Sequence, residues 1–427
     1  MRYKDRALKI WMLLIFSLIL SGCANGKVQN VKHKTDSIWE IELEGGNPQF
    51  VEDYIYLWDL LENEYPMLAT AKRITGKDTQ EIKEGYYNRI TSCILPEDFY
   101  TYVVNPCISE FGGVGHLGVI NDWLYEYMCS LYINHPEILD KYPPSKYNYE
   151  VLTSPKAESF YYGVMGLEKR VNDSNSETPY NVKDNLTFQY FSEISAGYIK
   201  IKHMNTYSGE NDLDYKALIS FFEKLEVEGY ENCIVDIRGN GGGNSEYWMK
   251  GLVEPNLKEP LEWESLMLIK GDTSRCYLSH SDEKIQKISK LSTDALPNLE
   301  EDDLADAQYF IKAQGIAEPV AGEKPTFSGR FWLLVDEGCY SSSEKLALFC
   351  KQTGFATIVG MQTGGDGIGV EPIVFTLPNT GICLRFSAAN GLNCDGSCNE
   401  EFGTTPDYVL PKSEDALEGC IKIILGS

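Results

Sequence analysis

The chain has 427 residues, of which 43% are hydrophobic and 12% aromatic, and its formal net charge is −25. A chain of this length and composition can bury a large core and can hold two or three domains, which excludes a disordered or fibrous protein. The strong negative charge would repel nucleic acid and anionic lipid headgroups, so we expect no nucleic acid partner.

The first 22 residues have the pattern of a secretory signal peptide. Four basic residues precede an apolar run from Ile10 to Leu20, which is too short to span a membrane comfortably, and Ser21 and Gly22 then lead to Cys23. The end of this stretch resembles the lipobox of bacterial lipoproteins. That resemblance implies that Cys23 is acylated and that the protein is lipid-anchored to a bacterial cell membrane, on its extracytoplasmic side.

Two segments follow the signal pattern. Residues 23–46 are polar and are expected to tether the folded part of the chain. Residues 47–120 are expected to form a small N-terminal helical domain, because the apolar spacing of residues 50–72 and 81–91 is helical.

The end of this domain carries a glycine-histidine segment. A helix-like run from Asp98 breaks at Gly112 and Gly113, and an apolar segment around His116 comes next. Residues 121–185 are rich in aromatic residues and show no clear period, so we expect them to form an irregular connecting region.

From Ala196 the pattern alternates between strands and helices, and we predict an α/β core over residues 186–427. An acidic, irregular insertion is expected at residues 253–328. The predicted strands are 196–204, 232–244 with a glycine loop at its end, 330–338 and 355–363, and the predicted helices are 214–229 and 342–354.

The serine run before the second of these helices has two interpretations. Ser341 and Glu344 have the spacing of a capping box, in which the serine accepts amide hydrogen bonds and the glutamate reaches back. Alternatively, one of these serines is a nucleophile. Taken by itself, the motif favours the cap.

Four motifs bear on this choice. The chain resembles the C-terminal processing, or tail-specific, serine peptidases and their relatives with a tricorn-type core, and the motifs follow the order found in that family. They cover about half of the chain and read "IVDIRGNGGG" at 234–243, "YSSSE" at 340–344, "ATIVGMQTGG" at 356–365 and "FGTTPDYVL" at 402–410.

The resemblance implies a fold and an activity. The fold class is α/β, with a crotonase/ClpP-like β-α spiral core and the small N-terminal helical domain. The implied activity is that of a serine-type endopeptidase, which hydrolyses proteins or peptides through an acyl-enzyme without a metal or organic cofactor. Many relatives also contain a PDZ domain, but residues 121–185 are short and lack a glycine-rich carboxylate-binding loop, so we expect none here.

The resemblance aligns the nucleophile with Ser341, with Ser342 and Ser343 as alternatives. The processing peptidases use a lysine as the base, but Asp366 stands at the matching position, which rules out that serine-lysine pair. The tricorn-type relatives use a histidine from the N-terminal part, and His116 in "GGVGHLGVI" matches it. Neutral histidine can accept a seryl proton and return it to a leaving amine.

Two alternatives to this assignment stay open. His203, which follows a predicted strand, is a weaker rival for the base. His116 could instead be a structural histidine in a tight turn.

The resemblance also suggests an acid. It places a glutamate at Glu400, whereas Glu401, one residue further, is expected to face the other way. In tricorn-type relatives the glutamate acts through a serine beside the histidine, but this chain has Gly115 there. The relay is therefore rebuilt, or replaced by a direct contact or water, unless Glu400 is only a solvated loop charge.

An oxyanion needs two hydrogen-bond donors. The Ser342 amide is the first candidate, and the glycine loop supplies the second, for which the resemblance favours Gly242. Asp236 and Arg238 are expected to fix the end of the strand before this loop rather than to take part in chemistry.

The cysteine pattern gives little information about function. Cys394 and Cys398 form the only close pair and could make a local disulfide, but the second pair of ligands needed for a metal site is lacking, so no metal is expected.

Two further functions compete with the peptidase. A catalytically inactive peptide-binding lipoprotein would explain Asp366 and Gly115, and a lipoprotein that captures small solutes would explain only the signal sequence.

Overall fold

The computed structural model describes residues 46–168, 180–279, 284–322, 324–369 and 371–426. Residues 47–427 form one compact unit. The predicted signal peptide, Cys23 and the tether up to residue 45 lie outside the described residues. Within the described ranges, no helix combines the length and the apolar character needed to cross a membrane.

A six-stranded sheet forms the core, in the order β13-β9-β8-β4-β3-β2. Only β2 runs antiparallel to its neighbour, and the other pairs are parallel. This sheet and its crossover helices confirm the predicted α/β class. The strands are β2 (Leu186–Phe191), β3 (Ala196–Ile201), β4 (Asn232–Asp236), β8 (Arg330–Val335), β9 (Ala356–Gly360) and β13 (Tyr408–Val409).

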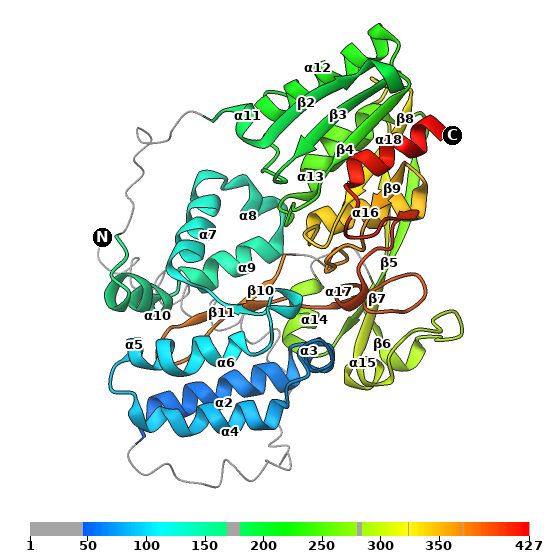
Figure 1. The fold of residues 1–427 in the computed structure, drawn as a ribbon. Helices are drawn as coiled ribbons and strands as arrows, with labels where there is room; N and C mark the ends of the chain where they lie inside the picture. Colours follow the sequence, from blue (N-terminus) through cyan, green and yellow to red (C-terminus); the bar gives the residue numbers. More distant parts are fainter. Residues whose placement is uncertain (1–45, 169–179, 280–283, 323, 370, 427) are drawn as a thin grey trace, which may run out of the picture. The chain divides into compact units, whose positions relative to one another are not determined.

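Both faces of this sheet are covered by helices (Figure 1). Side chains alternate along each strand, so Val235 packs toward α12 (Leu213–Glu228) and α16 (Ser342–Thr353), while its neighbour Ile234 packs toward α18 (Ala416–Gly426). Burial on two faces explains why these strands read as continuous apolar runs in the sequence.

The prediction of an irregular insertion at residues 253–328 is wrong. Strands β5 (Leu261–Ile269) and β7 (Tyr309–Ala317) pair antiparallel along their whole length, in a four-stranded sheet of order β12-β5-β7-β6. Exposed acidic residues such as Glu262 and Glu264 alternate with less exposed neighbours in β5, and the charge of the segment concealed this period of two. The remaining elements here are η7 (Met249–Val253), η8 (Glu254–Asn256), α14 (Asp272–Leu278), β6 (Gln286–Lys287), η9 (Ile288–Lys290), α15 (Glu301–Asp306) and, from later in the chain, β12 (Asn390–Leu392).

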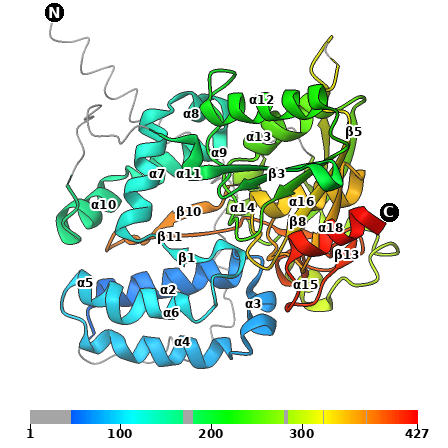
Figure 2. The same ribbon diagram turned by 45° about the horizontal axis from the view of Figure 1, so that its top comes forward.

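The N-terminal part is helical, as predicted, and α2, α4 and α6 lie side by side (Figure 2). The helix predicted over residues 50–72 is interrupted at Pro66, which cannot donate a helical hydrogen bond. The elements are α2 (Pro48–Asn63), α3 (Leu68–Thr75), α4 (Thr79–Tyr87), η2 (Asn88–Ser92), α5 (Pro96–Phe99), η3 (Tyr100–Val104), α6 (Asn105–Ser109) and η4 (Val114–His116).

The region after residue 121 is also helical where it is described, so the expectation of irregular structure was wrong. Several of its helices are short and begin at proline, which shortens the periodic stretches that a sequence pattern needs. Some of its aromatic residues fill the interior, as in the stacked pair Tyr125 and Tyr161, whereas others such as Trp123 are exposed. The elements are α7 (Asp122–Asn134), α8 (Glu137–Lys141), α9 (Pro143–Leu152), α10 (Pro155–Glu158), η5 (Ser159–Val164) and α11 (Val182–Asn185).

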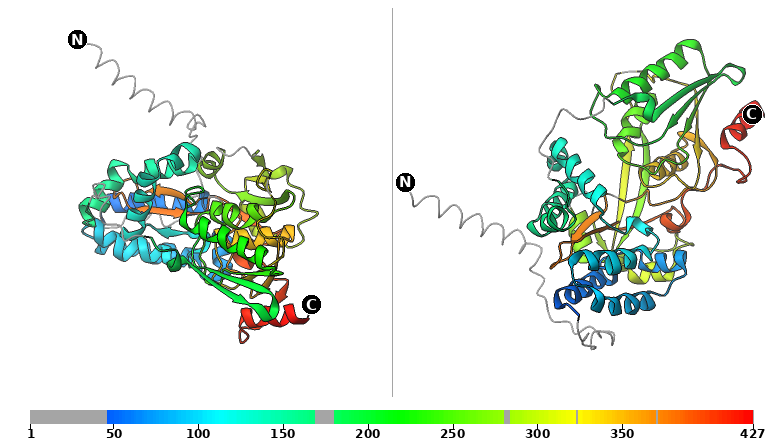
Figure 3. Two further views of the ribbon diagram at one scale, coloured as in Figure 1. Left: turned by 90° about the horizontal axis from the view of Figure 1, so that it is seen from above. Right: turned by 60° about the vertical axis from the view of Figure 1, so that its left-hand side comes forward.

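A small third sheet joins a strand from the N-terminal half of the chain to two strands from the C-terminal half. It contains β1 (Gly118–Val119), β11 (Cys383–Phe386) and β10 (Ile373–Thr376), all antiparallel. Strands β10 and β11 run among the N-terminal helices (Figure 3), where Asn148 Oδ1 accepts a hydrogen bond from the Val374 amide. Because β1 directly follows His116, this pairing sets where His116 lies against the C-terminal half of the chain.

Candidate active site

Ser341 lies at the first turn of α16, directly after the segment that leaves β8. Its backbone has φ 56° and ψ −120°, which is a strained conformation for a residue with a Cβ, and its side chain caps no amide of the helix. Glu344 does not reach back either, because its Oε1 accepts hydrogen bonds from Asn399 Nδ2 and Thr404 Oγ1. The capping-box interpretation is therefore wrong. Ser341 Oγ makes no hydrogen bond among the described residues.

The neighbouring serines differ from Ser341 in burial. Ser342 and Ser343 are 4% and 0% exposed, whereas Ser341 keeps partial solvent access. Ser342 Oγ also accepts a hydrogen bond from Trp248 Nε1 at 3.2 Å and lies 3.1 Å from Ser245 Oγ. A substrate can therefore reach only the first serine of the run.

The glycine loop after β4 packs directly against this turn. A Cβ at Gly242 would lie 2.9 Å from Ser341 Cβ and 2.8 Å from the Ser342 nitrogen, so only glycine allows the approach. The Ser342 amide has no acceptor in the described part of the chain. The Gly242 amide, in contrast, donates to Asn240 Oδ1 at 2.9 Å, so this predicted oxyanion donor is occupied in this arrangement.

His116 is held by Asp366. The two are joined by a hydrogen bond of 2.5 Å between His116 Nδ1 and Asp366 Oδ2, and Ser387 Oγ donates to the same carboxylate oxygen at 2.6 Å. An ionised carboxylate only accepts hydrogen bonds, so the imidazole proton lies on Nδ1 and the Nε2 lone pair of the neutral ring stays available. The His116 ring lies 4.9 Å, centroid to centroid, from the ring of Tyr340, the residue before Ser341.

Several residues of this candidate site have strained backbone conformations. In the described part of the chain, four residues other than glycine have a positive φ, and three of them are His116, Ser341 and Asp366. Residues in such conformations cluster at functional sites, where the surrounding structure holds them in place.

Glu400, in α17 (Asn399–Phe402), reaches the site but does not touch the His116 ring. Its Oε1 accepts a hydrogen bond from the Gly115 amide at 2.9 Å and its Oε2 accepts one from the Tyr340 hydroxyl at 3.0 Å. Burial, reinforced by the nearby charge of Asp366, raises the pKa of Glu400 to about 8. It is therefore not a solvated loop charge, and it binds the backbone amide of the residue before His116.

Other predicted residues lie outside the site. Glu401 turns away, as expected, but in a helical turn rather than a strand, and it pairs with Arg73 at 2.9 Å. Arg238 pairs with Asp236 at 2.7 Å and fixes the strand end as predicted. His203 is exposed, and no hydrogen bond of its ring is found among the described residues.

The sequence interpretation missed the roles of Asp366 and Ser387. In the sequence, Asp366 stands out only as a departure from the family lysine, although an acid in that position, together with a histidine, is itself a signal for a pair. Ser387 lies outside all four motifs, and nothing in the sequence singles it out.

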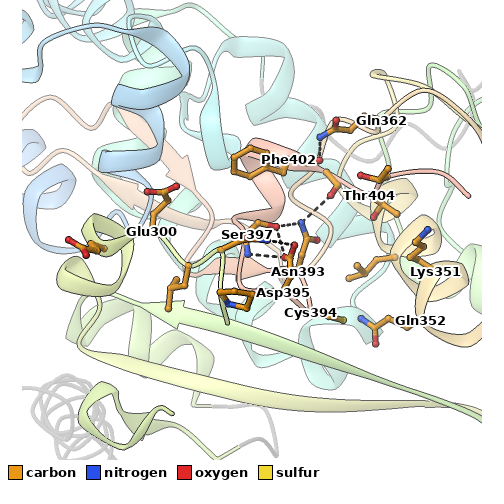
Figure 4. A pocket seen from close by; sticks show the side chains of 17 residues that line it. Glu300, Lys351, Gln352, Gln362, Asn393, Cys394, Asp395, Ser397, Phe402 and Thr404 are labelled. Carbon is orange, nitrogen blue, oxygen red and sulfur yellow. Dashed lines mark hydrogen bonds between the residues drawn. The ribbon is translucent and has the colours of Figure 1, made fainter. Parts of the chain in front are cut away.

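A separate cavity of about 940 Å³ lies along α16 and the loop before α17 (Figure 4). Its lining includes Lys351, Asn393, Cys394, Phe402 and Thr404, but none of the residues that surround Ser341.

The disulfide that the sequence allows beside this cavity is not formed. Cys394 and Cys398 are both free. No cluster of three or more His, Cys, Asp or Glu side chains suited to a metal ion is found in the described ranges.

Comparisons with known proteins agree with this architecture. A solved structure from Parabacteroides merdae ATCC 43184, which carries a provisional peptidase assignment, is 16% identical with a TM-score of 0.53, and the match covers 89% of this chain and 98% of that one. It supports a shared fold.

Two other solved structures are less similar. Mature CPAF is 13% identical with a TM-score of 0.49, covering 85% of this chain and 93% of its own. The photosystem II D1 C-terminal processing protease is 20% identical with a TM-score of 0.33, covering 54% and 47%. No curated protein sequence matches the chain.

The model of peptidase family S41 matches residues 195–410, which is half of the chain and includes the strand before α12, the glycine loop, the serine run and the Glu400 segment. A family of serine peptidases implies proteins or peptides as substrates. The chain belongs to peptidase family S41.

Proposed function

We propose that the protein is a serine-type endopeptidase of the tail-specific group, with Ser341 as nucleophile and His116 as general base. The observation that carries this proposal is the bond between His116 Nδ1 and Asp366 beside a strained serine that keeps partial solvent access. The arrangement matches the roles of a Ser-His-Asp triad, in which the acid fixes the ring so that Nε2 can take the seryl proton.

The reaction has two stages. Ser341 Oγ attacks the peptide carbonyl carbon while its proton passes to His116 Nε2, and His116 then gives that proton to the leaving amine as the peptide C–N bond breaks. Water, deprotonated by His116, releases the acyl group and restores the serine. Asp366 is a positioning residue, because it acts through the ring and stabilises the imidazolium.

The oxyanion of each stage needs donors. The Ser342 amide, at the start of α16, is free and favoured by the helix dipole. Gly242 can supply the second donor only after its amide leaves Asn240 Oδ1, so we propose that substrate binding shifts the glycine loop.

The hydrogen bond from the Gly242 amide to Asn240 Oδ1 favours a second candidate function, that of a protein that binds peptides without cleaving them. Hydrolysis of an unfolded protein by the full chain, compared with Ser341→Ala and His116→Ala, separates the two. Cleavage by the wild type alone supports the peptidase. Peptide binding with no cleavage by any of the three supports the second candidate.

We further propose that Cys23 is acylated and holds the protein on the extracytoplasmic side of a bacterial membrane. The signal pattern and the small residues before Cys23 support this. Metabolic labelling with a fatty acid tests it: we expect label on the wild type, and label on Cys23→Ala would refute the assignment.

A further inference from the structure

Arg385 lies near the candidate active site, and its side chain has no hydrogen-bond or ion-pair partner among the residues that the structure describes. Its strand β11 is otherwise buried, since Cys383, Leu384 and Phe386 are inaccessible and only Arg385 keeps some solvent access. In the described part of the chain, no ion pair or hydrogen bond of its side chain is found. An unpaired and largely desolvated guanidinium is costly, because it can give up to five hydrogen bonds and here gives none.

The pairing of this part of the chain places Arg385 next to the candidate catalytic groups. Ser387, two residues further along, contacts both His116 and Asp366. Ser387 lies one residue beyond the end of β11, but its amide still donates to the Gly115 carbonyl oxygen, so the chain continues alongside the segment that holds His116. Side chains two residues apart in an extended chain share a face, which favours the same side for Arg385 and Ser387.

The strand beside Arg385 adds no side chain next to it. The β1 residue that faces Arg385 is Gly118, two residues after His116. A Cβ built at Gly118 would meet only the His116 carbonyl oxygen, at 3.9 Å. The pairing therefore brings Arg385 alongside the segment that holds His116.

Glu371, an acidic residue whose charge acts on Arg385, already has other hydrogen-bond partners. Glu371 accepts hydrogen bonds from the Tyr132 hydroxyl and from Ser145 Oγ, one at each carboxylate oxygen. Burial lowers the pKa of Arg385, and the electrostatic influence of Glu371, Tyr340 and Tyr132 only opposes this effect.

We propose that Arg385 binds a carboxylate of the peptide substrate and so selects peptides that carry a negative charge near the cleaved bond. The inference rests on the proposed peptidase function, because the anionic groups native to a peptide are its Asp and Glu side chains and its C-terminal carboxylate. A guanidinium pairs with a carboxylate through two parallel hydrogen bonds, which gives both affinity and orientation.

The test uses a mixed peptide library in three forms: untreated, with all carboxylates methyl-esterified, and with only the C-terminus amidated. The full-length wild type should cleave the untreated library at least about 10-fold faster than the esterified one, as expected for loss of a charge-assisted hydrogen bond. Equal rates would overturn the proposal. The amidated form identifies the source: slow cleavage indicates the C-terminal carboxylate, and fast cleavage indicates acidic side chains.

Two variants test whether Arg385 is responsible. Arg385→Gln should cleave the untreated and esterified libraries at similar rates, and Arg385→Lys, which keeps the charge but not the paired hydrogen bonds, should retain part of the preference. An Arg385→Gln variant that keeps the full preference overturns the proposal. If Arg385→Gln does not fold, an unchanged preference in Arg385→Lys does the same.

Binding to Ser341→Ala separates this inference from the proposed function. If the wild type cleaves no peptide, the peptidase proposal fails, but tighter binding of untreated than of esterified peptides by Ser341→Ala still supports the role of Arg385. If cleavage is normal and neither rate nor binding depends on the carboxylates, only the Arg385 proposal fails.

Discussion

Asp366 binds Nδ1 of His116 across a distance of 2.5 Å, at the position where the processing peptidases that this chain resembles carry a lysine. A lysine there would itself be the base. In the proposed mechanism the aspartate instead orients His116, which comes from the other half of the chain and takes the place of the lysine as the base.

Asp366→Asn should lower kcat by about 100- to 10,000-fold, because the amide can stabilise the wrong tautomer of His116 and cannot stabilise the imidazolium. Kinetics with an unfolded protein substrate measure this loss. Ser387→Ala is the matched control, because it removes only a hydrogen bond to the same carboxylate and should cost about 10-fold or less. Equal losses in both variants would contradict the positioning role of Asp366.

Ser341→Gly should be more stable than Ser341→Ala by about 1 kcal/mol. Both variants lose the nucleophile, but only alanine keeps the Cβ that strains a backbone at φ 56°. Urea unfolding of the two inactive variants measures the difference. An alanine variant at least as stable as the glycine variant would mean that this turn stores no strain.

Gly115→Ala should destabilise the protein by about 2 to 3 kcal/mol, because the new Cβ would lie 2.5 Å from Met67 Sδ at a φ of 57°. Gly113→Ala is the control, with a φ of 78° and nothing within 4 Å, and should cost about 1 kcal/mol. Thermal unfolding of both variants tests this, and similar losses would exclude the Met67 contact as the reason for glycine beside His116.

Glu400→Gln should change how stability depends on pH. Because burial raises the pKa of Glu400 from 4.5 to about 8, the folded protein holds a proton that the unfolded chain has already released between these pH values. The native state binds more protons there, so the Glu400 contribution makes stability fall as pH rises from about 4.5 to 8. Glutamine has no such proton to lose.

Urea unfolding of wild type and Glu400→Gln at pH 5 and pH 9 measures this contribution, since all other groups cancel in the difference. We expect the variant to gain stability relative to the wild type at pH 9. A difference between the two proteins that is the same at both pH values would refute the raised pKa.

Local patterns in the sequence were enough for several features. The strand-helix alternation predicted the main sheet and α16, because strands buried on both faces read as apolar runs. The serine run and the glycine loop predicted Ser341 and Gly242 as neighbours, since each motif has its own backbone requirement. Resemblance to the family supplied His116 and Glu400 as site residues.

Acidic residues and prolines prevented other elements from being predicted from the sequence. Acidic residues on the exposed side of β5 hid its pairing with β7, and the short, proline-started helices after residue 121 lacked the length that a periodic signal needs.

The sequence by itself therefore determined the α/β core and singled out the turn at Ser341 and the residue His116 as candidates, because each rests on contacts between residues close in the chain or on a motif. Only the tertiary structure decided what holds that histidine. His116 and Asp366 are 250 residues apart, and they meet because β1 pairs with β11 and brings the N-terminal segment against the loop after β9. A pairing between distant strands depends on how the whole chain packs, and no local pattern of residues encodes it.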